Sequence, residues 1–257
     1  MKTDPCQTAN GAHPPTLNAN TESFILMKLL SSATATLLAT AVAHAALVTE
    51  TYTPSLSPTA IADNDPVLTP FLLSVTTSAI RSLSEVSVSF ELRGLSPDAG
   101  WAGDAFASLL KSPVGVVPSV SDPSAVLLNR VGVTAGNAAG FSYDGWNITL
   151  RDSAATDIHD ETLLSGVLTG IFQPDGRLGA TDLLRSADLD VFTGGDGNGD
   201  WRFNVGDLAA GGNLELVSWS LTLTGEDTVP EASTWAAGAG LALLAAGTLW
   251  RRGQSGN

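Results

Sequence analysis

A run of acidic and amide side chains late in the chain offers the clearest local chemistry. Asp196, Asn198, Asp200 and Asp207 occupy positions one, three, five and twelve of the segment that begins at Asp196. Oxygen ligands at these positions are the pattern by which a calcium-binding loop surrounds its ion. Such loops need glycine at position six for a sharp turn, and this chain has Trp201 there. The residues therefore match a calcium loop only in part.

The same segment also has the period of a strand. Its large apolar residues alternate with polar ones, in the order Trp201, Arg202, Phe203, Asn204, Val205. At about 3.3 Å per residue, a strand here would hold Asp200 and Asp207 roughly 23 Å apart, too far to share one ion. The two interpretations exclude each other. We favour the strand, preceded by a turn at 196–199.

His159 is the only histidine beyond residue 45, and it is the natural candidate for acid–base chemistry. A Ser-His-Asp triad needs an imidazole between a carboxylate and a hydroxyl group. The segment 157–161 is polar and turn-like, and the chain contains no Gly-x-Ser-x-Gly elbow. We therefore expect an exposed loop histidine, no catalytic residue and a protein that is not an enzyme.

The N-terminal region has the pattern of a targeting segment. Met27-Lys28 is followed by a short apolar run and by Ala43-His44-Ala45, the small-x-small pattern of a signal-peptidase site. We predict a signal peptide over 27–45, and a leader over 1–26 that precedes the true start at Met27. Processing would remove Cys6, the one cysteine of the chain, so no disulfide or thiolate metal site is expected.

The C-terminal region predicts a membrane anchor. Residues 235–250 are uncharged and apolar, with a tryptophan at each end, and Arg251 and Arg252 follow directly. Sixteen helical residues span about 24 Å, which is short for a hydrocarbon core of roughly 30 Å. Snorkelling arginines and interfacial tryptophans favour a transmembrane helix with its C-terminus in the cytoplasm.

The sequence around this predicted helix resembles the PEP-CTERM sorting signal. Val229, Pro230 and Glu231 precede the apolar stretch, and Arg251 and Arg252 close it, although Ala232 replaces the second proline of the family motif. The resemblance implies export in a Gram-negative bacterium and an inner-membrane anchor before processing. It further implies an exosortase-type processing enzyme as partner and a destination at the cell surface or outside the cell.

The composition narrows the function classes. The 257 residues include 12 basic and 26 acidic ones, giving a net charge of −14, and the excess acidity lies within 46–228. Such a charge argues against nucleic acid as a partner. Short segments of alternating polarity, separated by Gly, Pro, Asp and Asn, predict an all-β sandwich or barrel. The expected strands are 70–76, 86–92, 105–110, 125–129, 146–151, 201–205 and 217–223, with a weak helical pattern over 180–187. In the last strand we expect Val217, Trp219, Leu221 and Leu223 to share the apolar face.

The order of motifs over residues 67–225 resembles the P domain of proprotein convertases. The segments that carry the resemblance are 83–88, 103–115, 126–132, 199–208 and 216–223. The family fold implies a jelly-roll β-sandwich over 46–228. It also implies that Asp104 and Asp152 match acidic positions that can hold a structural calcium ion. Convertases carry their proteolytic triad in a separate domain, so the resemblance confers no protease activity.

Together these observations predict an exported structural or adhesive protein of the cell surface or the exopolysaccharide matrix. Its partners would be the processing enzyme, the membrane through the C-terminal helix, and an extracellular glycan or protein. The alternative is a secreted calcium-dependent hydrolase, or an accessory domain of one.

Overall fold

Residues 45–95, 100–161 and 165–227 are described in the computed structural model of the chain. The predicted leader, the apolar run of the signal peptide, the sorting motif and the helix over 235–250 lie outside these residues. No helix within the described ranges is long and apolar enough to cross a membrane.

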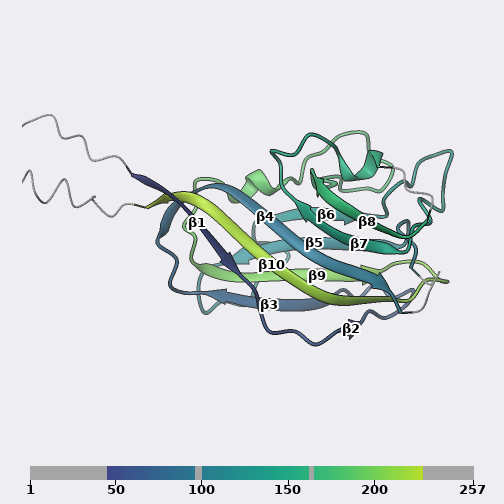
Figure 1. Cartoon of the computed structure of the whole chain (residues 1–257), viewed down its shortest axis with the longest axis horizontal. Helices are drawn as coiled ribbons and strands as arrows, with labels where there is room; N and C mark the ends of the chain where they lie inside the picture. Colours follow the sequence, from purple (N-terminus) through teal and green to yellow (C-terminus); the bar gives the residue numbers. More distant parts are fainter. Residues whose placement is uncertain (1–44, 96–99, 162–164, 228–257) are drawn as a thin grey trace, which may run out of the picture. The chain divides into compact units, whose positions relative to one another are not determined.

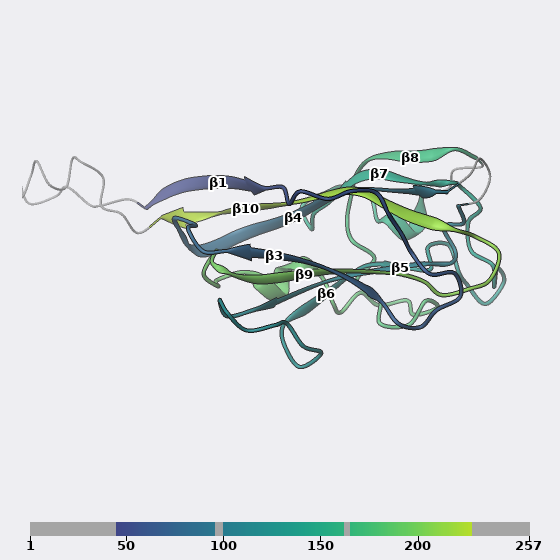
Figure 2. The same cartoon turned by 90° about the horizontal axis from the view of Figure 1, so that it is seen from below.

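The strands form two sheets that lie one above the other, as Figure 2 shows edge-on. The larger sheet has the order β1 (Ala46–Tyr52), β10 (Leu214–Asp227), β4 (Ile80–Gly94), β7 (Gly145–Leu150) and β8 (Val167–Phe172), with β2 (Thr59–Ala60) also paired to β10. The smaller sheet has the order β3 (Thr69–Val75), β9 (Gly199–Asp207), β5 (Ala105–Ser112) and β6 (Ser124–Asn129). Neighbouring strands are antiparallel except β7 and β8. The chain crosses repeatedly between the sheets, so strands distant in sequence lie side by side (Figure 1).

The core is formed by the apolar faces of both sheets. Phe203 of β9 lies 5.4 Å from Phe90 of β4 and 5.3 Å from Trp219 of β10, measured between ring centroids. All three side chains are at most 2% exposed. Because β9 belongs to the smaller sheet and β4 and β10 to the larger, these rings join the two layers directly.

The prediction of an all-β fold with two sheets is confirmed, and a strand lies at each of the seven expected segments. Three strands were not predicted: β1, β2 and β8. β1 and β8 are edge strands, and large apolar residues on them, such as Leu47 and Ile171, face solvent. Their side-chain pattern therefore gives little sign of a buried face.

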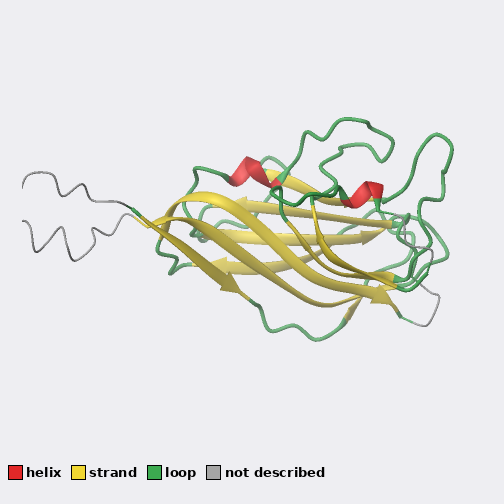
Figure 3. Cartoon of the chain, turned by 45° about the horizontal axis from the view of Figure 1, so that its top comes forward, coloured by secondary structure: helices red, strands yellow, loops and turns green. Residues whose placement is uncertain are grey.

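Two local expectations are wrong. Residues 180–187 are a loop, and the only helical segments in the described ranges are the short 3₁₀ turns η2 (Ile158–Asp160) and η3 (Leu189–Phe192), shown in red in Figure 3. In β10, Leu216 rather than Val217 is fully buried, because a bulge between Leu216 and Ser218 shifts the alternation by one residue.

The two ends of the described unit lie together. Ala46 of β1 pairs with Asp227 of β10, and the register continues to Tyr52 opposite Leu221. Hydroxyl pairs on the exposed face reinforce this pairing: Thr49 with Thr224 at 3.0 Å and Thr51 with Thr222 at 2.9 Å. The first and last strands are thus held to each other.

We predict that Trp219→Ala lowers the free energy of unfolding by about 3–5 kcal/mol, because it leaves a cavity between the sheets. Leu72→Ala serves as the control, since Leu72 is 58% exposed and its loss should cost less than about 0.5 kcal/mol. Urea denaturation of both variants measures the two values. Equal losses would contradict the assignment of Trp219 to the core.

Candidate functional site

The candidate site lies at one end of the sandwich, where β9 finishes at Asp207. Along β9 the residues Trp201, Phe203, Val205 and Asp207 share the inward face, because side chains alternate in a strand. Asp207 is fully buried, and its cross-strand neighbour Ala105 is buried as well. The carboxyl group of Asp207 therefore continues an inward face that is otherwise apolar along β9.

Both side-chain oxygens of Asp207 lack a hydrogen-bond partner among the described residues. A buried polar group without a partner is costly, and a buried ionised carboxylate more so. The Asp207 carboxyl group is therefore expected either to keep its proton or to be a ligand of a bound cation.

Two further aspartates lie near this carboxyl. Asp104, which is 7% exposed, directly precedes β5, and its carbonyl oxygen accepts a hydrogen bond from Leu208 N–H at 2.8 Å. Asp63 belongs to the loop before β3, which is held to the end of β9 by a bond of 3.0 Å from Asp65 N–H to the Asp207 carbonyl oxygen. The charges of Asp104 and Asp63 both act on Asp207.

The pKa values reflect this crowding. Burial, with added repulsion from Asp104 and Asp63, raises the pKa of Asp207 to about 7, and the nearby Ala209 N–H offsets only part of the rise. Burial likewise raises the pKa of Asp104, although the Arg130 guanidinium opposes the rise. One proton or one cation near Asp207 would relieve the repulsion between these carboxyl groups.

The chemistry of these residues fits a hard cation, since calcium prefers carboxylate, carbonyl and water oxygens. Within the described ranges, no three acidic, histidine or cysteine side chains by themselves form a group that could hold a metal ion. A calcium ion at Asp104 and Asp207 would therefore have to complete its shell with backbone carbonyl oxygens or water.

Asp152, the second calcium candidate, lies apart from this pair, in the turn after β7. Its Oδ1 accepts a hydrogen bond from Leu189 N–H at 3.3 Å. Burial, together with the charges of Asp188 and Asp190, raises its pKa, although hydrogen bonds from the backbone of η3 oppose the rise. Neither Asp104 nor Asp207 is among the charges that act on it, so Asp152 belongs to a different environment.

The four residues of the alternative calcium loop do not converge on one point, because 199–207 is a strand, as we favoured. Asp196 and Asn198 stay together, since Asn198 Nδ2 donates to Asp196 Oδ1 at 2.9 Å. Asp196 pairs with Arg81 at 3.3 Å, and Asn198 binds the backbone of Ser78. Asp200 accepts bonds from Ser74 at 2.5 Å and from the Gly115 N–H at 2.7 Å. Only Asp207 reaches the candidate site. The site therefore combines Asp104 from one prediction with Asp207 from the other, and adds Asp63, which the sequence analysis missed.

The expectation of an exposed His159 is wrong. His159 lies in η2 and is only 9% exposed; its Nδ1 is 2.8 Å from Asp175 Oδ2 and its Nε2 is 3.2 Å from the Val133 carbonyl oxygen. Burial disfavours the imidazolium, but the bond to Asp175 and its charge outweigh this effect, so the pKa of His159 is raised. Both ring nitrogens are engaged within the fold.

The carboxylate that holds His159 belongs to a buried ionic network. Asp175 is fully buried and also pairs with Arg177 at 3.2 Å, and Arg177 pairs with Asp157 at 2.9 Å. Asp157 in turn accepts the His159 backbone N–H at 2.9 Å. No sequence pattern indicates this network, since its members come from two loops that β8 separates in the chain.

The fold and this site define an all-β, two-sheet protein with a candidate cation site. No family model and no curated protein matches the sequence. The chain is similar to the serine protease of Aeromonas sobria solved in complex with the chaperone ORF2, at 18% identity over 76% of this chain and 29% of that chain, with a TM-score of 0.39. It is also similar to the serine protease of Aeromonas sobria solved separately, at 17% identity over 74% and 29% of the two chains, with a TM-score of 0.38. The chain thus spans less than a third of the matched protease chains.

We predict that Asp207→Asn changes how stability depends on pH in calcium-free buffer. The folded protein holds the Asp207 proton up to about pH 7, whereas the unfolded chain releases it near the ordinary pKa of 3.8. Asp207 therefore ionises in the unfolded chain at a lower pH than in the folded protein. This difference lowers the free energy of unfolding progressively as the pH rises from about 4 to about 7, with no further loss above that.

The carboxamide that Asp207→Asn introduces cannot ionise, so the variant should lack this part of the decline. Urea unfolding from pH 4.5 to 8 in the presence of a chelator measures the difference between wild type and variant. Glu226→Gln, on an exposed residue of β10, is the control and should keep the wild-type profile. Parallel profiles for wild type and Asp207→Asn would contradict a buried, unpaired carboxyl.

Proposed function

We propose that this protein is exported and acts without catalysis, as a structural or adhesive component of the cell surface or extracellular matrix. The observation that carries the proposal is the placement of its polar groups. Both ring nitrogens of His159 are bonded within the fold, to Asp175 and to the Val133 carbonyl oxygen, although His159 also lines a pocket of about 510 Å³. The outer face of the smaller sheet carries a separate pocket that can serve as a binding surface. The net charge of −14 argues against nucleic acid as a binding partner.

We propose that the fold is a P-domain-like jelly roll. Two interleaved four-strand orders support this: β1-β10-β4-β7 in one sheet and β3-β9-β5-β6 in the other. Early strands pair with late ones, β1 with β10, β3 with β9 and β4 with β7, as in a double Greek key. β8, paired in parallel with β7, extends the larger sheet beyond this pattern.

The proposed route out of the cell rests on the two targeting segments. The signal peptide over 27–45 starts export, and the helix over 235–250 holds the chain in the inner membrane. An exosortase-type enzyme then processes it near Val229, Pro230 and Glu231. The described unit begins and ends at adjacent strand positions, Ala46 and Asp227, so it can fold as one body between these segments.

We further propose that calcium stabilises the sandwich at Asp104 and Asp207. The supporting observation is the fully buried Asp207 carboxyl, whose oxygens have no partner in the described residues. The cation would neutralise the crowded carboxylates and join the ends of β5 and β9 to the loop that contains Asp63.

Calcium is therefore expected to raise the melting temperature of the protein, because it binds only the folded state. At a concentration 100-fold above its Kd, the stabilisation would be about 2.7 kcal/mol. Asp104→Ala and Asp207→Asn should abolish the rise, whereas Asp152→Asn should retain it. Calorimetry with calcium and with chelator makes the measurement, and a flat response of the wild type to both would remove calcium from the proposal.

The sorting signal can be tested in a host that processes such proteins. The double change Pro230→Ala with Glu231→Ala should leave an unprocessed precursor in the inner membrane, because the processing enzyme loses its motif. Cell fractionation and immunoblotting locate the protein, with Gln254→Ala as the control beyond the arginine pair. Wild-type protein found intact in the cytosol would overturn the proposed route, and hydrolysis of glycoside or ester substrates would favour the alternative hydrolase.

A further inference from the structure

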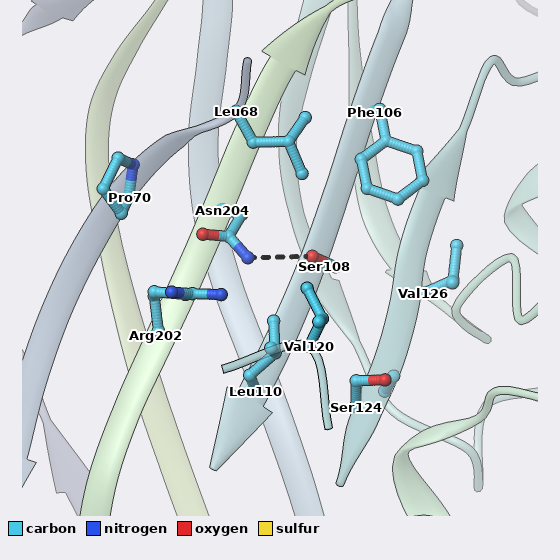
Figure 4. A pocket seen from close by; sticks show the side chains of 11 residues that line it. Leu68, Pro70, Phe106, Ser108, Leu110, Val120, Ser124, Val126, Arg202 and Asn204 are labelled. Carbon is cyan, nitrogen blue, oxygen red and sulfur yellow. Dashed lines mark hydrogen bonds between the residues drawn. The ribbon is translucent and has the colours of Figure 1, made fainter. Parts of the chain in front are cut away.

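A pocket of about 310 Å³ lies on the outer face of the smaller sheet. Figure 4 shows its side chains, which come from β3, β9, β5 and β6, from Leu68 just before β3 and from Val120 of the loop between β5 and β6. A cavity of this size suits a ligand no larger than one or two sugar rings.

The strand register builds the pocket as two rows of side chains across the sheet. The first row runs from Pro70 through Asn204 and Ser108 to Val126. The second contains Arg202, Leu110 and Ser124. Because the alternate residues of β9 and β5 face the core, these polar side chains must point outward.

A glycine opens the upper end of the pocket. Gly206 lies opposite Phe106, and a Cβ atom at Gly206 would fall 2.5 Å from Leu68 Cδ2. Leu68 can therefore lie across β9, and with Phe106 it forms an apolar wall on this side of the pocket (Figure 4).

Among the described residues that line the pocket, Arg202 is the only charged one. Its Nε is buried and has no hydrogen-bond partner, and Arg202 forms no ion pair within the described residues, although the chain is strongly acidic. Its planar guanidinium is suited to a carboxylate, which it can bind through two parallel hydrogen bonds. An unused cation of this kind points to an anionic group on the ligand.

The centre of the pocket offers hydrogen bonds to hydroxyl groups. Asn204 and Ser108 are only 5% and 7% exposed, and Asn204 Nδ2 donates to Ser108 Oγ at 3.2 Å. This bond leaves the Ser108 proton and the Asn204 carbonyl oxygen for another partner, and the Ser124 hydroxyl lies at the edge. A purely apolar acid would desolvate these groups without bonding to them, which is unfavourable.

We propose that this pocket binds a single sugar unit bearing one carboxylate, such as a hexuronic acid residue of an extracellular glycan. Its carboxylate pairs with Arg202, its hydroxyl groups bond to Asn204 and Ser108, and its C–H face packs on Phe106 and Leu68. The net charge of −14 repels a densely charged polyanion, so the fitting glycan carries sparse or terminal carboxylates. The assignment rests on the proposed adhesive function and specifies its ligand class.

The test is an NMR titration of the isotope-labelled protein with galacturonate, with uncharged galactose as the matched ligand. Galacturonate should shift the amide signals of Phe106, Ser108 and Asn204, and galactose should bind at least about tenfold more weakly. Arg202→Gln should lower the galacturonate affinity about tenfold, to the level of galactose, since about 1.4 kcal/mol of charge-assisted bonding is lost. Arg81→Gln is the matched control and should bind as wild type, because Arg81 pairs with Asp196 outside the pocket.

A second variant keeps the test decisive if Arg202→Gln fails to fold. Val120→Glu changes a side chain that is 94% exposed, so the fold should persist, while the added negative charge at the rim weakens galacturonate binding. Equal affinities for galacturonate and galactose, no shifts at the pocket, or tighter binding of hexanoate would each overturn the sugar assignment. If the protein is nevertheless exported and surface-bound, only the ligand class fails and the proposed function stands.

Discussion

The inward packing of β9 against the opposite sheet decides where the β9 residues of the candidate cation site and of the pocket lie. Phe203 contacts both Phe90 and Trp219, so the odd-numbered residues of β9 must face the core. The same alternation carries Asp207 into the end of the core and turns Arg202 and Asn204 outward. A shift of the register by one residue would exchange the two sets, so the candidate cation site and the pocket both depend on the packing of Phe203 against Phe90 and Trp219.

Sequence periodicity predicted the strands that bury one face completely, such as β4, β9 and β10, because burial imposes the alternation directly. It missed β1 and β8, which are edge strands with apolar side chains in solvent. It also placed Val217 on the core face, since a bulge leaves no trace in the polarity pattern. His159 looked exposed for a related reason: its polar neighbours suggested a surface turn, whereas Asp157 and Asp175 hold the turn within the fold.

The candidate cation site was predictable only in its parts. Asp104 and Asp207 were each singled out, but in two separate sets, because their proximity comes from the pairing of β5 with β9. Pairing between strands so far apart in the chain cannot be read from local sequence. Asp63 was not singled out, because its loop is held to β9 and β10 by backbone bonds, from Asp65 to Asp207 and from Ile61 to Leu214, which have no side-chain signature. The pocket, likewise, exists only once the register sets Ser108 beside Asn204.

The antiparallel pairing of Ala46 with Asp227 has a mechanical consequence. A force that separates the two ends of the domain acts across the β1–β10 pair at its terminus. It breaks the hydrogen bonds between the two strands one after another. A force between Asp227 and a ligand held on the outer face of the smaller sheet acts instead along β10, which is bonded to β1 on one side and to β4 on the other. Many hydrogen bonds between the strands must then break at the same time, so the domain would resist tension from a captured ligand far better than tension between its own ends.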